Sequence, residues 1–321
     1  MNQALSEQTI LGFDIGGTKT GLVLGNHQGR VLQRTEFQTP AEQEFDSAMR
    51  TISAETGRFL ADCRSRGLPL PAQISVAVGG PLDIEHGVLF SPPHLAAWGN
   101  APLKQRLEEQ FGLPARVEHD GNAGALAEWL FGAGRGLRHL VFLTAGTGLG
   151  AGIILNGSIL HGATDTAGEV GHIRIAPDGP LLYGKSGSWE GYCSGTGLAL
   201  LAHAYRPQRW SQQVTTREIV SLALAGDAEA REVVRQSGEW LGKGLAILID
   251  ILNPEAIILG TLGVVLGDLL IEPARQAVRQ EALPASAVAC RIVPAALGKS
   301  LGDVASLMAV IYHTIQCRRD E

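Results

Sequence analysis

The sequence predicts an α/β protein built from two related lobes, and three observations lead to this prediction. Two runs rich in glycine and threonine, residues 12–20 and 144–150, each lie between two apolar, strand-like segments. Similar series of strands and helices follow each run. The chain has 321 residues, more than one hydrophobic core usually spans. We therefore expect a duplicated fold with one mixed sheet in each lobe.

Apolar patterning and turn residues predict the elements of the first half. An amphipathic helix is expected at residues 41–66, ended by Gly67 and Pro69, and a short helix at 102–111. Strands are expected at residues 9–14, 21–24, 30–35, 74–78 and 115–118.

The second half repeats this order. Strands are expected within residues 140–159 and at 256–259, and helices at 195–205, 227–252 and 301–317. We place the boundary near Glu118, so that residues 1–118 and 300–321 form a small lobe and residues 119–299 a large lobe, with a cleft between them.

Composition excludes several classes of function. The net charge of −6 and the lack of a long basic run argue against a nucleic-acid partner. No uncharged apolar stretch reaches about 18–20 residues, and residues 1–8 do not resemble a signal peptide, so we expect a cytoplasmic protein without a membrane partner. The scattered cysteines predict neither disulfides nor a cysteine zinc site: Cys63, Cys193, Cys290 and Cys317.

The two glycine-threonine runs are typical of hairpin turns that bind phosphate. Glycine lets backbone N–H groups approach a ligand closely, and consecutive N–H groups in a turn attract anions. One such turn is weak evidence, because many hairpins need glycine for geometry alone. Two in matching contexts indicate a polyphosphate held from both sides.

Asp120 stands between the two runs, at the end of a strand and directly before a helical, alanine-rich segment. A carboxylate there can cap the helix, which is the commonest role of Asp at this position. It can also act as a general base that accepts the proton of a sugar hydroxyl during phosphoryl transfer. The residues alone leave both roles open.

Four segments together resemble the ROK family of bacterial sugar kinases and repressors: residues 14–19, 120–122, 145–148 and 168–172. The resemblance spans nearly the whole chain. It implies an actin-like (ribonuclease H-like) ATPase fold with the active site between the lobes, and ATP and Mg²⁺ as cofactors. It further implies that Asp120 is the catalytic base and that Asp14 holds Mg²⁺ through water. The residues it assigns to ATP are Asp14, Gly16, Gly17, Thr18, Lys19, Thr144, Gly146, Thr147, Gly148 and Gly260. Thr261 stands where the family's adenosine-side turn usually has a second glycine.

The same resemblance assigns a hexose site. Its residues are Gly80, His94, His119, Asp120, Glu169, His172 and Glu190. Several fixed polar groups suit a hexose, whose hydroxyls would otherwise be buried without partners. A structural histidine is the alternative for His172. For His94 and Trp98, in a loop that faces the sugar in the family, ordinary packing is an equally good interpretation.

The chain departs from the family at the zinc site. Most members carry three cysteines that bind zinc together with a histidine, His172 here. Leu181, Tyr183 and Ser188 stand at the cysteine positions, so we expect no structural zinc site. We expect Leu181 and Tyr183 to replace the metal by apolar packing, and the loop that carries Glu190 to be more mobile.

Two asparagines of the sugar side are also replaced, by His94 and His119. Histidine offers different hydrogen-bonding geometry, which leaves the identity of the hexose open.

The sequence leaves two classes of function to compare. The first is an ATP-dependent kinase acting on a hexose hydroxyl, with the 6-hydroxyl of glucose or a relative as the family habit. The second is a non-catalytic sugar sensor. Because only residues 1–8 precede the first predicted strand, we expect no helix-turn-helix, and Asp120 and both turns are intact, which favours the kinase. An actin-like polymer would not explain Glu169, His172 and Glu190 together. The resemblance also implies a homodimer.

Overall fold

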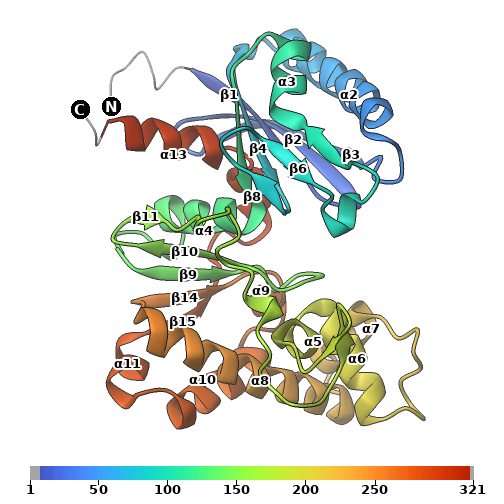
Figure 1. Ribbon diagram of the computed structural model, residues 1–321, viewed down its shortest axis with the longest axis vertical. Coiled ribbons are helices and arrows are strands. Elements are labelled where there is room, and N and C mark those ends of the chain that lie inside the picture. Colours follow the sequence, from blue (N-terminus) through green and yellow to red (C-terminus); the bar gives the residue numbers. More distant parts are fainter. Residues whose placement is uncertain (1–7, 319–321) are drawn as a thin grey trace. The chain divides into compact units, whose positions relative to one another are not determined.

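The computed structural model describes residues 8–318, which form two compact units (Figure 1). Unit 1 contains the described residues up to Ala127, the segment His161–Ala167, and the described residues from Lys299 to Arg318. Unit 2 contains Glu128–Leu160 and Gly168–Gly298. The chain passes from unit 1 to unit 2 within helix α4 (Asp120–Phe131).

Unit 1 contains a five-stranded mixed sheet in the order β3-β2-β1-β4-β8. Strands β1, β2 and β3 are antiparallel neighbours, whereas β4 runs parallel to β1 and β8 parallel to β4. The strands are β1 (Thr9–Ile15), β2 (Lys19–Asn26), β3 (Val31–Gln38), β4 (Pro71–Val78) and β8 (Ala115–His119).

Unit 2 contains a second five-stranded sheet, in the order β11-β10-β9-β14-β15. Its first three strands are again antiparallel neighbours, and β14 and β15 again run parallel. The strands are β9 (Leu140–Leu143), β10 (Ala151–Leu155), β11 (Ser158–Ile159), β14 (Ala256–Leu259) and β15 (Arg291–Pro294). The two units thus repeat one strand order and one pattern of directions, as the predicted duplication requires.

The first sheet of unit 1 is apolar on both faces, so helices cover both. Leu11, Phe13 and Ile15 belong to a core that also includes residues of α2 (Phe45–Ser65) and α3 (Leu103–Phe111). Gly12 points to the other face, where a Cβ would collide with Ser306 and contact Leu307. Side chains alternate between the faces of a strand, so α12 and α13 cover the face opposite α2.

One predicted helix is broken. The segment 301–317, expected as a single helix, forms α12 (Leu301–Ala305) and α13 (Met308–Cys317). The Ser306 hydroxyl donates to Asp303 O at 2.7 Å, and Leu307 is fully buried against Gly12 and Gly25. Packing of this turn onto two glycines of the sheet accounts for the break, which apolar periodicity does not reveal.

Small elements complete unit 1. A three-stranded sheet follows β4, formed by β5 (Leu82–Asp83), β6 (Val88–Phe90) and β7 (Asn100–Pro102) in that order. The short helix η1 (Pro93–Leu95) lies between β6 and β7. None of these elements was predicted, because each is too short to show a periodic pattern.

Helices make up most of unit 2. The long helix α8 (Ala228–Leu252) packs along α10 (Asp268–Glu281) and contacts α5, α6 and α7. The predictions at residues 195–205 and 227–252 correspond to α6 and α8. The remaining helical segments and a hairpin are α5 (Trp189–Cys193), α6 (Gly195–Tyr205), α7 (Thr216–Leu224), α9 (Leu262–Leu266), α11 (Pro284–Ala289), η2 (Val170–His172), η3 (Gly298–Ser300), β12 (Leu181–Leu182) and β13 (Lys185–Ser186).

In the part of the chain that the structure describes, no helix combines the length and the apolar character needed to cross a membrane.

Candidate functional site

The first glycine-threonine run forms the turn between β1 and β2. Gly16 N donates to Lys19 O at 3.0 Å, and the Thr39 hydroxyl donates to Gly16 O at 2.7 Å, which fixes the turn. Among the described residues, the amides of Gly17 and Thr18 have no hydrogen-bond partner. Two such free N–H groups on a fixed turn suit an anionic ligand.

Lys19 lies beside this turn but is already paired. Its Nζ lies 2.5 Å from Glu36 Oε1, and the side chain is 65% exposed. An exposed pair of this kind contributes little to stability, so exchanging Glu36 for a phosphate would cost little. The predicted phosphate contact of Lys19 stays a prediction.

Asp14 lies on β1 among other carboxylates. Burial, followed by the negative charges of Asp120 and Asp303, raises the pKa of Asp14 to about 7. A cation next to these carboxylates would offset their repulsion, so the site fits Mg²⁺. The described residues contain no cluster of three His, Cys, Asp or Glu side chains arranged to hold a metal directly. The water-mediated contact of Asp14 with Mg²⁺ stays a prediction.

Asp120 is the first residue of α4, directly after β8. Its Oδ1 accepts the Gly121 N–H at 2.7 Å, and the side chain is 53% exposed. No partner of its Oδ2 is found among the described residues. The carboxylate is thus oriented by one oxygen and leaves the other open, as a general base requires.

His119 and His94 approach the glycines of the strand ends in unit 1. A Cβ on Gly79 would collide with the His94 ring, and one on Gly80 would lie 3.0 Å from His119 Cδ2. The Gly121 N–H donates to His119 Nδ1 at 3.2 Å, which assigns the acceptor role to that nitrogen. The structure thus brings Gly80, His94, His119 and Asp120 together.

The pKa of His94 lies below its usual value, mainly because the ring is buried. The charge of Asp120 opposes this shift, and His119 adds to it. Trp98 from the same loop is fully buried and packs edge-on against Phe45 at 5.7 Å. Packing is therefore the role of Trp98, whereas His94 lies among the predicted sugar residues.

The sequence interpretation missed Glu118, a buried carboxylate beneath this segment. Its Oε1 accepts the His119 N–H and the Asn122 amide, both at 2.9 Å, and its Oε2 lies 2.9 Å from His161 Nε2. The hydrogen bond to Glu118 is the main reason that the pKa of His161 is raised. A charged residue at the end of an apolar strand was the available signal for Glu118.

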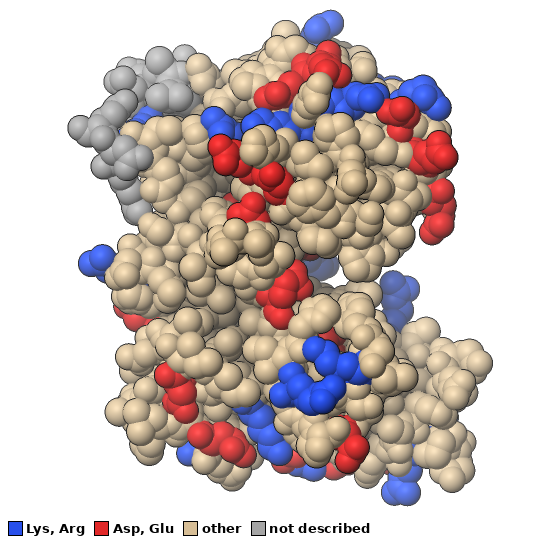
Figure 2. Space-filling model, viewed as in Figure 1, with Lys and Arg blue, Asp and Glu red and all other residues tan. Residues whose placement is uncertain are grey.

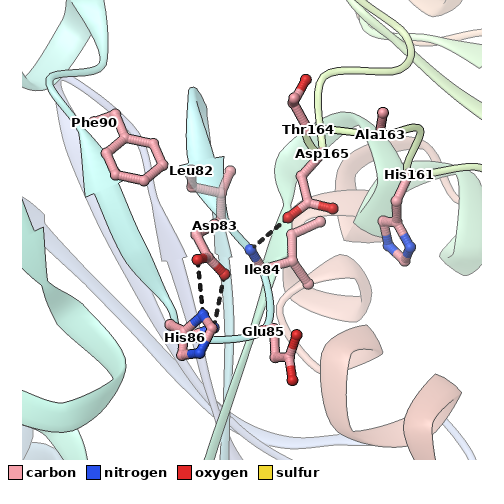
Figure 3. A pocket seen from close by; sticks show the side chains of 10 residues that line it. All are labelled: Leu82, Asp83, Ile84, Glu85, His86, Phe90, His161, Ala163, Thr164 and Asp165. Carbon is pink, nitrogen blue, oxygen red and sulfur yellow. Dashed lines mark hydrogen bonds and ion pairs between the residues drawn. The ribbon is translucent and has the colours of Figure 1, made fainter.

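His161 lines a cavity of about 510 Å³ within unit 1 (Figure 3). The loop residues His161, Thr164 and Asp165 lie across it from the β5–β6 turn. Asp165 Oδ2 accepts the Ile84 N–H at 2.9 Å, and Asp83 accepts from the ring and the amide of His86. The cavity contains no predicted site residue, but it gives solvent a path to His161.

The second glycine-threonine run, between β9 and β10, is more heavily bonded. Gly146 N donates to Thr144 O at 2.6 Å and to Gly148 O at 3.1 Å, and Gly150 N donates to Thr144 Oγ1 at 3.1 Å. Among the described residues, the amides of Thr147 and Gly148 have no hydrogen-bond partner. The second turn therefore presents two adjacent free N–H groups, as the first turn does.

The turn at Gly260 lies beside the second run. Gly260 N donates to Leu143 O at 2.8 Å, and Leu262 N donates to Ala145 O at 3.0 Å. Thr261 has a φ of +24°, in a region that β-branched residues rarely adopt. The position where the resemblance expects glycine is thus one where the backbone needs it.

Glu190 connects the second run to the predicted sugar residues of unit 2. Its side chain is buried, and Oε2 accepts the Leu149 N–H at 2.9 Å. Ser188 caps the helix that carries it, by accepting the Gly191 N–H. Glu169 directly precedes the short helix η2, His172 is the last residue of that helix, and both are exposed.

The former cysteine positions do not fit a zinc site. Leu181, Tyr183 and Ser188 offer no thiolate, and Ser188 is used as a helix cap. The Tyr183 ring stacks on His172, with centroids 4.9 Å apart and planes inclined by 22°. The expectation that Leu181 packs as a replacement for the metal is wrong, because its side chain is 66% exposed on the strand β12.

On the face shown in Figure 2, acidic and basic side chains are interspersed and do not form a large patch of one charge. This agrees with the small net charge of −6.

The protein consists of two repeated α/β units, each with a pair of free turn amides, and has a carboxylate at the start of α4. These features assign it to the class of proteins with an actin-like ATPase fold. Residues 10–310 match the model of the ROK family. The chain belongs to the ROK family.

Relatives include both kinases and regulators. A glucokinase of Halalkalibacterium halodurans is 32% identical over 314 residues, which cover 94% of each chain. A ROK family glucokinase from Streptomyces griseus, solved in complex with glucose and AMPPNP, has a TM-score of 0.77 and 31% identity over 93% of this chain and 97% of that one. A ROK family transcriptional regulator, a homologue of the E. coli Mlc protein, has a TM-score of 0.86 and 26% identity over 96% of this chain and 79% of that one.

These similarities confirm the predicted family and the actin-like fold. They also bear out the predicted class of enzyme, a sugar kinase.

Proposed function

We propose that this protein transfers the γ-phosphoryl group of ATP to a hydroxyl of a hexose, with the 6-hydroxyl of glucose as the first candidate. The observation that carries the proposal is the Asp120 carboxylate, held by the Gly121 N–H through one oxygen and open at the other. The relative solved with glucose and an ATP analogue supports these two substrates.

In the proposed mechanism, Asp120 accepts the proton of the attacking hydroxyl as the oxygen bonds to the γ-phosphorus. The bond between the γ-phosphorus and the oxygen that bridges it to the β-phosphorus breaks in the same step, and ADP is the leaving group. Phosphate oxygens are bound by the free amides of both turns, Gly17 and Thr18 in the first and Thr147 and Gly148 in the second. These amides also stabilise the negative charge that develops on the oxygens during transfer. Gly80, His94, His119, Glu169, His172 and Glu190 bind the sugar hydroxyls, and Gly260 lies on the adenosine side. Asp14 would hold Mg²⁺ through water, and the bound ion would supply neutralisation of phosphate charge.

The main competing function is a sugar-sensing regulator that binds a hexose without phosphorylating it. The TM-score of 0.86 to a ROK transcriptional regulator favours it as the second candidate. The two functions differ in one product, because a kinase releases ADP when the sugar is added and a sensor does not.

The test is a coupled assay of ADP release with a panel of glucose, fructose, mannose, N-acetylglucosamine and N-acetylmannosamine. We expect ADP release that depends on one or two of these sugars, together with a stoichiometric sugar phosphate in the mass spectrum. Binding of a sugar by calorimetry without ADP release would favour the sensor.

The homodimer, the cytoplasmic location, and the lack of a nucleic-acid or membrane partner stay predictions. Sedimentation of the protein with and without sugar would test the dimer.

A further inference from the structure

The junction between β8 and α4, where the proposed base lies, is held by one buried carboxylate. Glu118 is the fourth residue of β8, and its side chain is buried. Its Oε1 accepts the His119 N–H and a hydrogen of the Asn122 side-chain amide, both at 2.9 Å. His119 directly precedes Asp120, and Asn122 follows it by two residues. One carboxylate oxygen is therefore bonded to the chain on both sides of Asp120.

The second oxygen of this carboxylate has a partner from a distant part of the chain. Glu118 Oε2 lies 2.9 Å from His161 Nε2, and the two residues are 43 positions apart. The side chain of Glu118 is 5% exposed and that of His161 is 31% exposed. A buried carboxylate that lost this partner would turn toward another donor or take up a proton. His161 therefore fixes the orientation of the oxygen that holds the junction.

His161 belongs to a short segment, His161–Ala167, that packs within unit 1 although the chain on either side of it belongs to unit 2. A second side chain also attaches this segment. Asp165 Oδ2 accepts the Ile84 N–H at 2.9 Å, at the turn between β5 and β6 (Figure 3). The two attachments thus reach different elements, and only the one through His161 leads to the junction between β8 and α4.

We propose that His161 is a positioning residue for the proposed base: its imidazole holds the Glu118 carboxylate, which in turn holds the chain on both sides of Asp120. The described residues show no direct contact between His161 and Asp120, so the effect passes through Glu118. The consequence for catalysis rests on the proposed function. The ordering of the junction does not depend on it.

Two substitutions of His161 separate this role from simple attachment of the segment. His161→Leu removes the donor to Glu118, whereas the amide of His161→Gln places an N–H group near the position of Nε2. Asp165→Gly is the matched control, because it removes the other attachment of the same segment. Glycine also suits the φ of +57° at this position. His161→Asn, whose amide is too short to reach Glu118, repeats the removal with a polar side chain.

The first measurement needs no sugar. Amide hydrogen exchange in the peptide that contains residues 117–124 reports on the His119 N–H, which Glu118 accepts. We expect exchange there to be faster by about threefold or more in His161→Leu, and to stay within about twofold of the unmodified protein in His161→Gln and Asp165→Gly. Exchange in α2 of the same unit, residues 45–65, should rise by a smaller factor, because the change is local to the junction.

The second measurement is kcat, and the KM for each substrate, with D-glucose or the panel sugar that gives the fastest ADP release. We expect kcat to fall about tenfold in His161→Leu and to stay within about twofold in His161→Gln and Asp165→Gly. The KM for the sugar should rise about threefold in His161→Leu, because His119 is a predicted sugar residue. The KM for ATP should change by less than about twofold.

Several results would overturn the proposal. These are unchanged exchange at residues 117–124 in His161→Leu, an equal rise in α2, equal losses of kcat in Asp165→Gly, or a glutamine variant no better than the leucine variant. Loss of the folded state in both His161→Leu and His161→Asn would show a structural role and overturn it as well. Faster exchange at the junction in a protein that phosphorylates no hexose would leave the ordering by His161 intact and contradict the proposed function alone.

Discussion

The two glycine-threonine turns are alike in sequence and in their free amides, but they are joined to the predicted sugar residues in different ways. In the first turn, Gly17 packs against the backbone of η1: a Cβ there would lie 2.9 Å from His94 Cβ and 3.0 Å from His94 O. In the second turn, Leu149 donates a hydrogen bond to the Glu190 side chain. One link thus depends on backbone shape, and the other on a single carboxylate.

Two copies of a motif can therefore share a predicted ligand-binding role and still be held in place by different kinds of contact. A link through backbone shape survives most side-chain changes. A hydrogen bond to a buried carboxylate is lost with that side chain, and leaves an amide unpaired. The second turn is therefore the more vulnerable of the two.

The two turns should differ most when the predicted sugar residue linked to each turn is replaced by alanine, which is His94 for the first turn and Glu190 for the second. Glu190→Ala should raise the KM for the hexose about 100-fold, and the KM for ATP about threefold, because the second turn loses its support. His94→Ala should raise the KM for the hexose about tenfold and leave the KM for ATP within about twofold, since Gly17 contacts only atoms that alanine retains. Steady-state kinetics at saturating co-substrate measures both. Equal effects of the two variants on the KM for ATP would show that the two turns do not differ in how they are supported.

A smaller effect is expected from added methyl groups within the second turn. A Cβ on Gly148 would lie 2.9 Å from Glu190 Oε2, whereas the nearest atom to one on Gly146 is Thr261 Oγ1, at 3.7 Å. Gly148→Ala should therefore weaken hexose binding about tenfold, and Gly146→Ala less than about threefold, by calorimetry without nucleotide. Comparable losses of hexose affinity in the two variants would show that the contact between Gly148 and Glu190 does not affect sugar binding.

In unit 1, the pair of His161 and Glu118 predicts a pH dependence of stability. The pKa of His161 is raised in the fold, so its protonated form stabilises the native state. This contribution is complete below the unfolded pKa of about 6.5 and is lost as the pH rises through the folded pKa.

The free energy of unfolding should decrease less between pH 6 and 8.5 in His161→Asn than in the unmodified protein, by about 1 kcal/mol. Urea titrations at each pH measure this difference. His86→Asn is the matched control, because His86 lines the same cavity and is 69% exposed. Parallel pH curves for the His161 variant and the unmodified protein would contradict the assignment.

The smallest effect is expected at Thr261, next to the second turn. Thr261→Gly should relieve the backbone strain at a φ of +24° and raise stability by about 0.5–1 kcal/mol, after the entropic cost of glycine. Thermal unfolding measures the change. Asn253→Gly is the control, since asparagine tolerates its φ of +44°, and a lower melting temperature for Thr261→Gly would contradict the interpretation.

The sequence predicted the repeated hairpins and their turns because glycine and alternating apolar residues are local signals. It could not predict the partners of the turns, since Glu190 and His94 lie far away in the sequence and only the fold brings them close. Glu118 was missed for the same reason: its role follows from a hydrogen bond to His161, which lies 43 residues further along the chain. The break in the last helix was missed because Gly12 and Gly25 cause it.

The central claim is that Asp120 accepts the proton of a hexose hydroxyl while both turns bind the polyphosphate. The most direct measurement compares hexose-dependent ADP release and hexose binding in the unmodified protein, in Asp120→Asn and in Asp83→Asn, a control carboxylate that pairs with His86. We predict that Asp120→Asn lowers kcat by about 10²-fold or more and keeps hexose affinity within about threefold, with Asp83→Asn unchanged. Turnover in Asp120→Asn comparable to that of the unmodified protein would contradict the account.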